Sequence, residues 1–237
     1  MQWLNKRMIL ALLFIFIAMP LTIFIGIVHF DDRRFYLISL VLLFLAMLPF
    51  ALLFEKRKPE ARELIVISVL CGIAVAGRVA FFMLPQIKPI VAIVIIAGIV
   101  FGPESGFLVG AMSGFVSNFF FGQGPWTPWQ MFCLGIIGFL AGVLFKKGLL
   151  PRTVLPICIF GGLATLVIYG GLINIGAALM FSAGFNWEIL LAFYGTGLPF
   201  DLAHAIATVI FLWILARPMI EKLERIKVKY GMTETLR

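Results

Sequence analysis

Long uncharged runs separated by short charged segments dominate the chain. The runs cover residues 8–28, 35–54, 64–84, 89–103, 105–145, 153–181 and 198–216, and Arg78, Asp201 and His204 are the polar exceptions that stand out within them. A membrane-spanning helix needs roughly 20 apolar residues, with a working range of about 17–25. The pattern therefore predicts a series of transmembrane helices.

The run 105–145 is too long for one helix. Residues 122–129 read Gly-Gln-Gly-Pro-Trp-Thr-Pro-Trp, and such Gly and Pro residues interrupt a helix. We therefore expect two spans, at about 105–121 and 130–145, which brings the prediction to eight spans. The run 8–28 follows Lys6 and Arg7, but it is longer than a signal-peptide core and has no small-residue cleavage site, so we expect it to be a retained span.

Composition excludes a soluble protein. Hydrophobic residues make up 62% of the 237 residues, charged residues only 13%, and the mean hydropathy is +1.11. Soluble domains carry roughly 25% charged residues. The net charge of +8 does not indicate nucleic-acid binding, because the Lys and Arg residues lie in short loops, as expected of cytoplasmic flanks.

Charge bias predicts the topology. If all eight segments cross, every basic residue lies on one side except Arg33, Arg34, Lys88 and the intramembrane Arg78. The positive-inside rule then places both termini in the cytoplasm and residues 122–129 outside. The short segment 89–103 must cross as well, because otherwise the charges of the 146–152 loop would fall outside.

Small residues recur at helical spacing on three of the predicted spans. The first stripe consists of Gly72, Ala76 and Ala80. The second consists of Gly106, Gly110 and Gly114, and the third of Gly138 and Gly142. Small residues let helices approach closely in a membrane. Each stripe is consistent with internal packing or with docking of another membrane protein.

Polar residues at membrane depth are few. Arg78 is interpreted either as a side chain that snorkels to the interface or as one that faces a cavity for a polar solute. Asp201 and His204 share a helix face and either hydrogen-bond to each other or contact a ligand. Glu104 follows Pro103 at a helix start, where it offsets the helix dipole.

Residues 118–130 form the most unusual segment, which combines aromatic rings, amides and a backbone stiffened by Gly and Pro. We expect a ligand-binding loop here and not merely an aromatic belt. With nearby positions at the same end, including the 182–197 loop that would close the pocket, the predicted substrate-binding residues are Arg78, Lys88, Asn118, Gln123, Trp126, Thr127, Trp129, Gln130, Trp187, Tyr194, Asp201 and His204.

Motifs of catalysis are missing from the sequence. It has no nucleotide-binding Gly-x-x-x-x-Gly-Lys-Ser/Thr loop, no His-Glu-x-x-His zinc motif and no carboxylate pair within the membrane. Cys71, Cys133 and Cys158 are expected to be buried thiols that bind no metal. No catalytic residue, metal site or permanently bound cofactor is predicted.

Three segments resemble a known family: Gly-Arg-Val-Ala at 77–80, Gly-Ile-Val-Phe-Gly-Pro-Glu-Ser-Gly-Phe at 98–107, and Phe-Gly-Gln-Gly-Pro-Trp-Thr-Pro-Trp-Gln-Met at 121–131. They are similar to the substrate-binding S components of energy-coupling factor (ECF) vitamin transporters, over roughly residues 64–218. The 121–131 string resembles the cobalamin-type subset.

The resemblance implies an all-α membrane fold with a six-helix core at 59–218, a two-helix N-terminal extension at 1–58 and a cytoplasmic tail at 219–237. It implies docking of a transmembrane coupling subunit at Gly72, Ala76 and Ala80, and two ATPase subunits that drive import. The expected location is the bacterial cell membrane, and the expected ligand is cobalamin or a related corrinoid.

Other interpretations stay open at this point. The ligand is alternatively another vitamin or a queuosine precursor. The chain is alternatively a membrane enzyme acting on lipid or an assembly partner, and we expect a nucleic-acid partner in none of these cases.

Overall fold

Six continuous helical runs make up the part of the chain that the structure describes. The structure is a computed structural model and describes residues 44, 47, 61–181 and 186–232. The runs are α4 (Ala61–Ala80), α5 (Ile90–Phe101), α6 (Pro103–Phe121), α7 with η2 (Thr127–Ala141, Gly142–Lys146), α8 with η3 and α9 (Val154–Leu163, Ala164–Gly170, Gly171–Phe181), and α10 (Trp187–Lys229). The described residues contain no strand, which confirms the all-α prediction. Apart from residues 44 and 47, the predicted spans at 8–28 and 35–54, and with them the 1–58 extension, lie outside the described residues.

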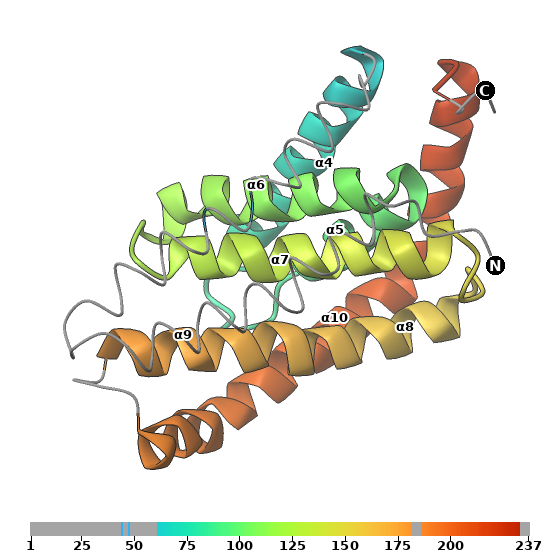
Figure 1. The fold of residues 1–237 in the computed structure, drawn as a ribbon. Helices are drawn as coiled ribbons and strands as arrows, with labels where there is room; N and C mark the ends of the chain where they lie inside the picture. Colours follow the sequence, from blue (N-terminus) through green and yellow to red (C-terminus); the bar gives the residue numbers. More distant parts are fainter. Residues whose placement is uncertain (1–43, 45–46, 48–60, 182–185, 233–237) are drawn as a thin grey trace.

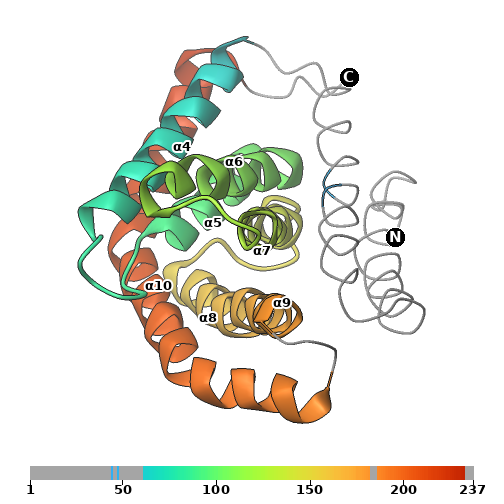
Figure 2. The same cartoon turned by 90° about the vertical axis from the view of Figure 1, so that its left-hand side faces the viewer.

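The runs are arranged around a central helix. In Figure 1, α7 lies between α6 and the α8–η3–α9 run, while α4 and α10 cross behind them. Figure 2 shows α4 and α10 together along one side of the bundle. Every residue of α5 is buried. Four of the runs are long and apolar enough to cross a membrane, namely α4, α7–η2, α8–η3–α9 and α10.

The short α5 helix does cross the bundle. Its twelve residues span about 18 Å, well below the roughly 30 Å of a bilayer core. Because protein surrounds it on all sides, α5 need not match the thickness of the lipid. Its end at Phe101 accepts a hydrogen bond from Lys146 (3.1 Å), and the residue before it, Val100, accepts one from Lys227 (3.1 Å). These contacts gather the end of α5, the 146–152 loop and the end of α10 at one end of the bundle, which we call the 146–152 end. The opposite end, with the α6–α7 connection, is the 122–126 end.

The glycines of α6 and α7 allow their backbones to touch. A Cβ added at Gly106 or at Gly138 would overlap the other residue's carbonyl group, and one at Gly110 would overlap the Leu134 carbonyl. These two stripes therefore serve internal packing, one of the two interpretations of the sequence.

The α4 stripe is different. Gly72, Ala76 and Ala80 are all exposed, and a Cβ at Gly72 would meet nothing within 4 Å. Ile65, Val69 and Ile73 extend the same exposed apolar face toward the 146–152 end. This stripe does not pack the described part of the fold.

Two boundaries differ from the sequence prediction. The prediction of a loop at 182–197 is wrong for residues 187–197, because α10 already begins at Trp187. Asn186 caps this helix by accepting a hydrogen bond from the Glu188 amide (2.9 Å). The helix then runs through Pro199 and Pro218, and it changes direction visibly in Figure 2. Proline is tolerated inside membrane helices, where it produces bends of this kind.

The predicted loop at 118–130 is also too long. Residue Asn118 lies on α6, and α7 already begins at Thr127 with Pro128 in its first turn. Proline favours this position, because the first helical amides have no partner within the helix. The connection is therefore only residues 122–126, and Gln130 and Trp129 belong to a helix.

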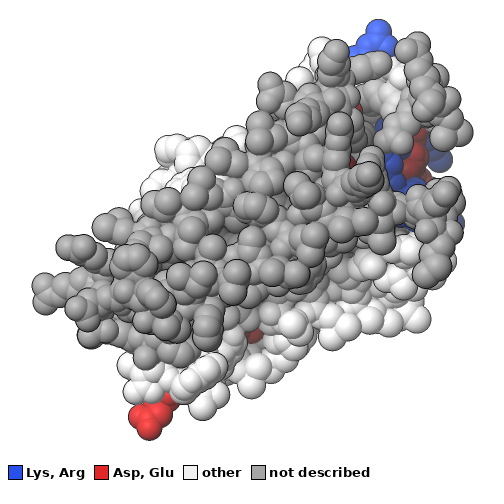
Figure 3. Space-filling model, in the orientation of Figure 1, with Lys and Arg blue, Asp and Glu red and all other residues white. Residues whose placement is uncertain are grey.

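The surface is consistent with a membrane protein. Figure 3 shows the visible Lys and Arg side chains near the end of α10 and mostly uncharged surface elsewhere among the described residues. Cys133 and Cys158 are buried free thiols, as predicted, and Cys71 is half-buried. The 219–229 segment continues α10, and the helix ends before Gly231, which has a positive φ of 65°.

Candidate functional site

Arg78 points into the bundle. It lies near the end of α4, and its guanidinium donates to the Ser117 hydroxyl and to Asn118 Oδ1 (2.9 Å) on α6. Both partners are almost fully buried, at 0% and 1% exposed. Of the two interpretations of Arg78, the geometry favours the inward-facing cation and excludes snorkelling away from the bundle.

Asn118 is the centre of this polar cluster. Besides accepting from Arg78, its Nδ2 donates to Thr127 Oγ1 (3.0 Å) and to Gln130 Oε1 (2.8 Å). The Thr127 hydroxyl in turn donates to Gln123 Oε1 (3.0 Å). The structure thus brings together five of the predicted site residues, because α6 and α7 meet closely and α4 packs beside them.

The 122–126 connection is held by its own contacts. Gln123 donates to the Phe115 carbonyl (3.0 Å), and the Trp126 indole donates to the Gly122 carbonyl (3.3 Å). The Trp126 ring lies so close to Gly124 that a Cβ there would overlap it. Gly122 has φ 94°, a conformation that glycine adopts without strain.

Trp129 lies in the core. It is 1% exposed and packs with Phe107, Phe132 and Phe139. A Cβ at Gly176 on α9 would come within 2.8 Å of its ring. Its indole nitrogen is buried and has no hydrogen-bond partner among the described groups. In this structure the ring joins α7 to α9.

A second polar group lies between α9 and α10. Asn174 donates to Asp201 Oδ2 (2.7 Å) and to the Gly170 carbonyl (2.9 Å), and Tyr194 donates to the Gly171 carbonyl (2.9 Å). The predicted alternative of an Asp201–His204 hydrogen bond is wrong, because the structure has no bond between these two described residues: Asp201 accepts from Asn174, and the His204 ring packs against Tyr169.

Tyr169 and His204 connect the two polar groups. Their rings meet edge to face, with centroids 4.9 Å apart. Tyr169 interacts electrostatically with both Arg78 and Asp201, and His204 interacts with Arg78 and Lys88. Tyr169 belongs to the π-helix η3, and π-helical turns are frequent at functional sites.

Lys88 joins the cluster from the α4–α5 connection. Its ammonium lies 5.2 Å from the centroid of the Phe121 ring, and the Arg78 guanidinium lies 4.4 Å from the same centroid. Trp187, by contrast, is 69% exposed at the start of α10, and none of the contacts described for this cluster includes it.

Four residues of this region were missed by the sequence prediction: Ser117, Phe121, Tyr169 and Asn174. Asn174 carried a usable signal, since it is an amide inside an otherwise apolar run, as Asn118 is. Ser117, Phe121 and Tyr169 carried none, because Ser, Phe and Tyr are common in membrane helices and only the packing brings these three beside Arg78 and His204.

An apolar groove lies elsewhere among the described residues. It has a volume of about 690 Å³ and is lined mainly by α4 and the end of α10, including Ile65, Val69, Ile73, Leu223 and Ile226, with Arg62 and Lys222 at its edge. It lies at the 146–152 end and continues the exposed face of α4. It is not part of the polar cluster at the other end.

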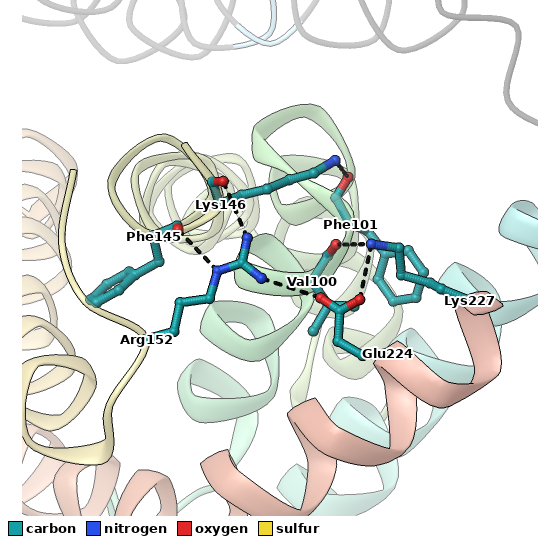
Figure 4. A network of polar contacts seen from close by, with 7 residues as sticks. All are labelled: Val100, Phe101, Phe145, Lys146, Arg152, Glu224 and Lys227. Atoms are coloured by element: carbon teal, nitrogen blue, oxygen red, sulfur yellow. Dashed lines mark hydrogen bonds and ion pairs between the residues drawn. The ribbon is translucent and has the colours of Figure 1, made fainter. Parts of the chain in front are cut away.

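The 146–152 end carries its own charged network (Figure 4). Glu224 pairs with Arg152 (3.3 Å) and Lys227 (3.2 Å). Arg152 also donates to the carbonyls of Phe145 (3.0 Å) and Lys146 (3.1 Å). Cations at the carbonyl ends of helices satisfy unpaired acceptors and offset the helix dipole. The network therefore fixes α10 to the ends of α5 and η2.

No group of three or more His, Cys, Asp and Glu side chains among the described residues could hold a metal ion. The polar cluster at the 122–126 end offers cationic, amide and aromatic groups, which suit the recognition of a small organic molecule.

Comparisons with known proteins place the chain in a family. The sequence profile described as "ECF-type riboflavin transporter, S component" matches residues 62–222, more than half of the chain. A UPF0397 protein of Vibrio atlanticus is 28% identical over 126 residues, which cover 50% of this chain and 69% of that protein. A UPF0397 protein of Aliivibrio fischeri is 30% identical over 89 residues, 35% of this chain and 48% of that protein. No solved structure matches.

The matched region begins in the first turn of α4 and ends within α10, so it covers all six helical runs and both polar groups. The chain is a multi-pass membrane protein, and it belongs to the family of ECF-type riboflavin transporter S components.

Proposed function

We propose that this chain is the substrate-binding subunit of an ATP-driven vitamin importer in the bacterial cell membrane. The sequence has no nucleotide-binding loop, so uphill transport requires partners that hydrolyse ATP. In this proposal two ATPase subunits and a transmembrane coupling subunit supply that work, and the chain itself catalyses no reaction.

The observation that carries the proposal is the polar cluster at the 122–126 end. Arg78, Asn118 and Gln130 are drawn together inside a bundle that is otherwise apolar. Polar and charged groups at membrane depth are costly and mark substrate pathways. Asp201, Tyr169 and His204 extend the cluster across the bundle, so a ligand here would contact α4, α6, α7, η3 and α10 together.

Two vitamins are the leading substrates. The matching family is described by riboflavin, and the 121–131 string resembles the cobalamin-type subset. In the described conformation Trp126 lies on its own loop and Trp129 lies in the core, so neither ring offers a broad open surface for a corrinoid. We therefore place a flavin or a similarly sized vitamin first and cobalamin second.

Thermal unfolding of the purified protein with each vitamin tests the proposal. A ligand present at one hundred times its Kd stabilises the folded state by about 2.7 kcal/mol, a clear shift in melting temperature. Stabilisation by riboflavin, cobalamin or another vitamin supports the proposal. A protein that no vitamin stabilises and that co-purifies with no ATPase contradicts it.

The coupling subunit is proposed to dock on α4. Its exposed face runs from Gly72, Ala76 and Ala80 to the apolar groove shared with α10. In lipid, close backbone contact drives helix association, so this exposed stripe suits a partner helix. The paired change Ala76→Leu with Ala80→Leu should abolish co-purification of the coupling subunit and block uptake, while vitamin binding persists.

The control is Ala192→Leu, which makes the same change at an exposed alanine of α10. It should leave co-purification intact. If the α4 double variant still binds the coupling subunit, the stripe has another role. If it loses vitamin binding too, the stripe is needed for the fold of the protein.

A further inference from the structure

Two cations share one aromatic ring at the 122–126 end. The Arg78 guanidinium and the Lys88 ammonium lie 4.4 Å and 5.2 Å from the centroid of Phe121. The ring attracts both, but the two like charges repel each other. Burial, and secondly the charge of Arg78, lowers the pKa of Lys88. The site thus concentrates positive charge.

No carboxylate of the described residues pairs with either cation. Arg78 donates to the neutral groups of Ser117 and Asn118, and Lys88 donates to the Leu84 carbonyl (3.2 Å). The ion pairs of the described residues involve Glu221 and Glu224 near the opposite end. An uncompensated cation in a low-dielectric region is costly, so an anion from outside the fold would be strongly favoured there.

Among the described residues, the carboxylate that belongs to this region is Asp201, on the α10 side of the cluster. Asp201 is held by Asn174 and lies against η3, since a Cβ at Gly170 would come within 2.7 Å of its carboxylate. The cluster is therefore polarised, with its positive side at α4 and the 81–89 connection and its acceptor side at α10. A ligand that spans it would be oriented by this polarity.

We propose that the transported substrate carries a carboxylate or phosphate group that binds between Arg78 and Lys88, with its hydrogen-bond donors directed toward Asp201. This inference rests on the proposed function, since it assumes that the cluster is the substrate site. It narrows the substrate class from vitamins in general to those that are anionic at neutral pH, so among the flavins it favours riboflavin 5′-phosphate over neutral riboflavin, and it disfavours cobalamin.

Matched pairs of anionic and neutral vitamins test the inference. Titration calorimetry of the protein in neutral detergent would compare riboflavin 5′-phosphate with riboflavin, nicotinate with nicotinamide, biotin with biotinamide, and pantothenate with panthenol. In the pair that binds, the anionic member should bind at least about 10-fold more tightly, which corresponds to about 1.4 kcal/mol.

Two variants locate the effect. Lys88→Gln should reduce the preference for the anionic member several-fold, and Arg78→Gln should remove most of it. Arg78 also bonds to buried groups of α6, so the Arg78→Gln protein can lose stability. Lys88 lies in a connection between helices, so the Lys88→Gln protein tests the preference without this complication. Lys229→Gln, at an exposed lysine near the other end, is the control and should change nothing.

Three outcomes overturn the inference. In the first, the neutral member of the pair binds as tightly as the anionic member. In the second, the preference for the anionic member survives in the Lys88→Gln protein. In the third, phosphatidylglycerol in nanodiscs abolishes this preference by competition, which would identify a lipid headgroup as the anion. In the first case the protein still binds a vitamin, so the proposed function stands. If no vitamin pair binds and no ATPase co-purifies, both this inference and the proposed function are contradicted.

Discussion

At the scale of single residues, polar groups buried in a bilayer need partners within the protein, and among the described side chains only the Ser113 hydroxyl and the Trp129 indole are buried without one. Asn118 shows how fully this is met, because its amide makes three hydrogen bonds to Arg78, Thr127 and Gln130. Water cannot replace these bonds at a residue that is 1% exposed. A single amide thereby holds together α4, α6 and α7 at the proposed substrate site.

Asn118→Leu should destabilise the protein by about 2–4 kcal/mol. Neutral hydrogen bonds contribute about 0.5–1.5 kcal/mol and those to charged groups about 1.5–3, and the change also leaves the Arg78 charge with one buried partner fewer. The measurement is the free energy of unfolding in mixed detergent. Gln123→Leu is the control, since water reaches this exposed residue, and it should cost less than about 1 kcal/mol. Equal losses in the two variants would contradict a central role for Asn118.

The sequence predicted this part of the site from residue type alone. Arg78, Asn118 and Gln130 stood out because polar residues are rare at membrane depth. Trp129 was predicted on the same reasoning to contact ligand, yet its ring packs in the core. An indole is both a large apolar surface and a hydrogen-bond donor. Whether it lies in the core or at a ligand site depends on the packing of the folded protein, which cannot be read from a single sequence.

At the scale of helices, close backbone contact and capping decide how the elements fit. The sequence located all six runs of the core from their hydrophobic lengths. It misplaced the start of α10 because Gly195, Gly197 and Pro199 read as loop residues. Tertiary contacts override this local preference, since Tyr194 of this segment donates to the Gly171 carbonyl of α9.

Two glycine substitutions should have opposite effects. Gly138→Ala places a methyl group against the carbonyl of Gly106, which forces α6 and α7 apart and should cost about 1–3 kcal/mol. Gly72→Ala meets nothing within 4 Å and should be neutral or stabilising by up to about 1 kcal/mol, because alanine favours helix. Melting temperatures in detergent would compare them. A loss in both proteins would mean that Gly72 also packs against protein.

The charged network near the end of α10 should stabilise the helix ends more through hydrogen bonds than through ion pairs. Arg152→Ala removes two bonds to carbonyls and should cost about 1–3 kcal/mol. Glu224→Gln removes two half-exposed ion pairs and should cost about 1 kcal/mol or less. Arg217→Ala, at a side chain that is 78% exposed, is the control and should stay within about 0.5 kcal/mol. If Glu224→Gln costs more than Arg152→Ala, the ion pairs dominate.

At the scale of the whole molecule, the two ends of the bundle differ in chemistry. The 146–152 end collects Arg152, Lys227 and Lys146 around helix ends, while the 122–126 end has a buried polar cluster. This alternation requires α5 to cross the bundle. Charge bias in the sequence indicated that crossing, and the complete burial of α5 explains how a helix of only twelve residues achieves it.

The topology prediction follows from the same asymmetry. Basic segments are retained in the cytoplasm, so the 146–152 end should face inward and the 122–126 end outward. Gln123 and Lys147 are both exposed and lie at these opposite ends. In a background with the three native cysteines replaced, a single cysteine at position 123 should react with a membrane-impermeant maleimide in intact cells, and one at 147 only after the membrane is opened. Reaction of both in intact cells would contradict the crossing of the helices between them. The reverse pattern would keep the fold and invert its orientation, and the polar cluster would then receive its ligand from the cytoplasm, which is incompatible with import.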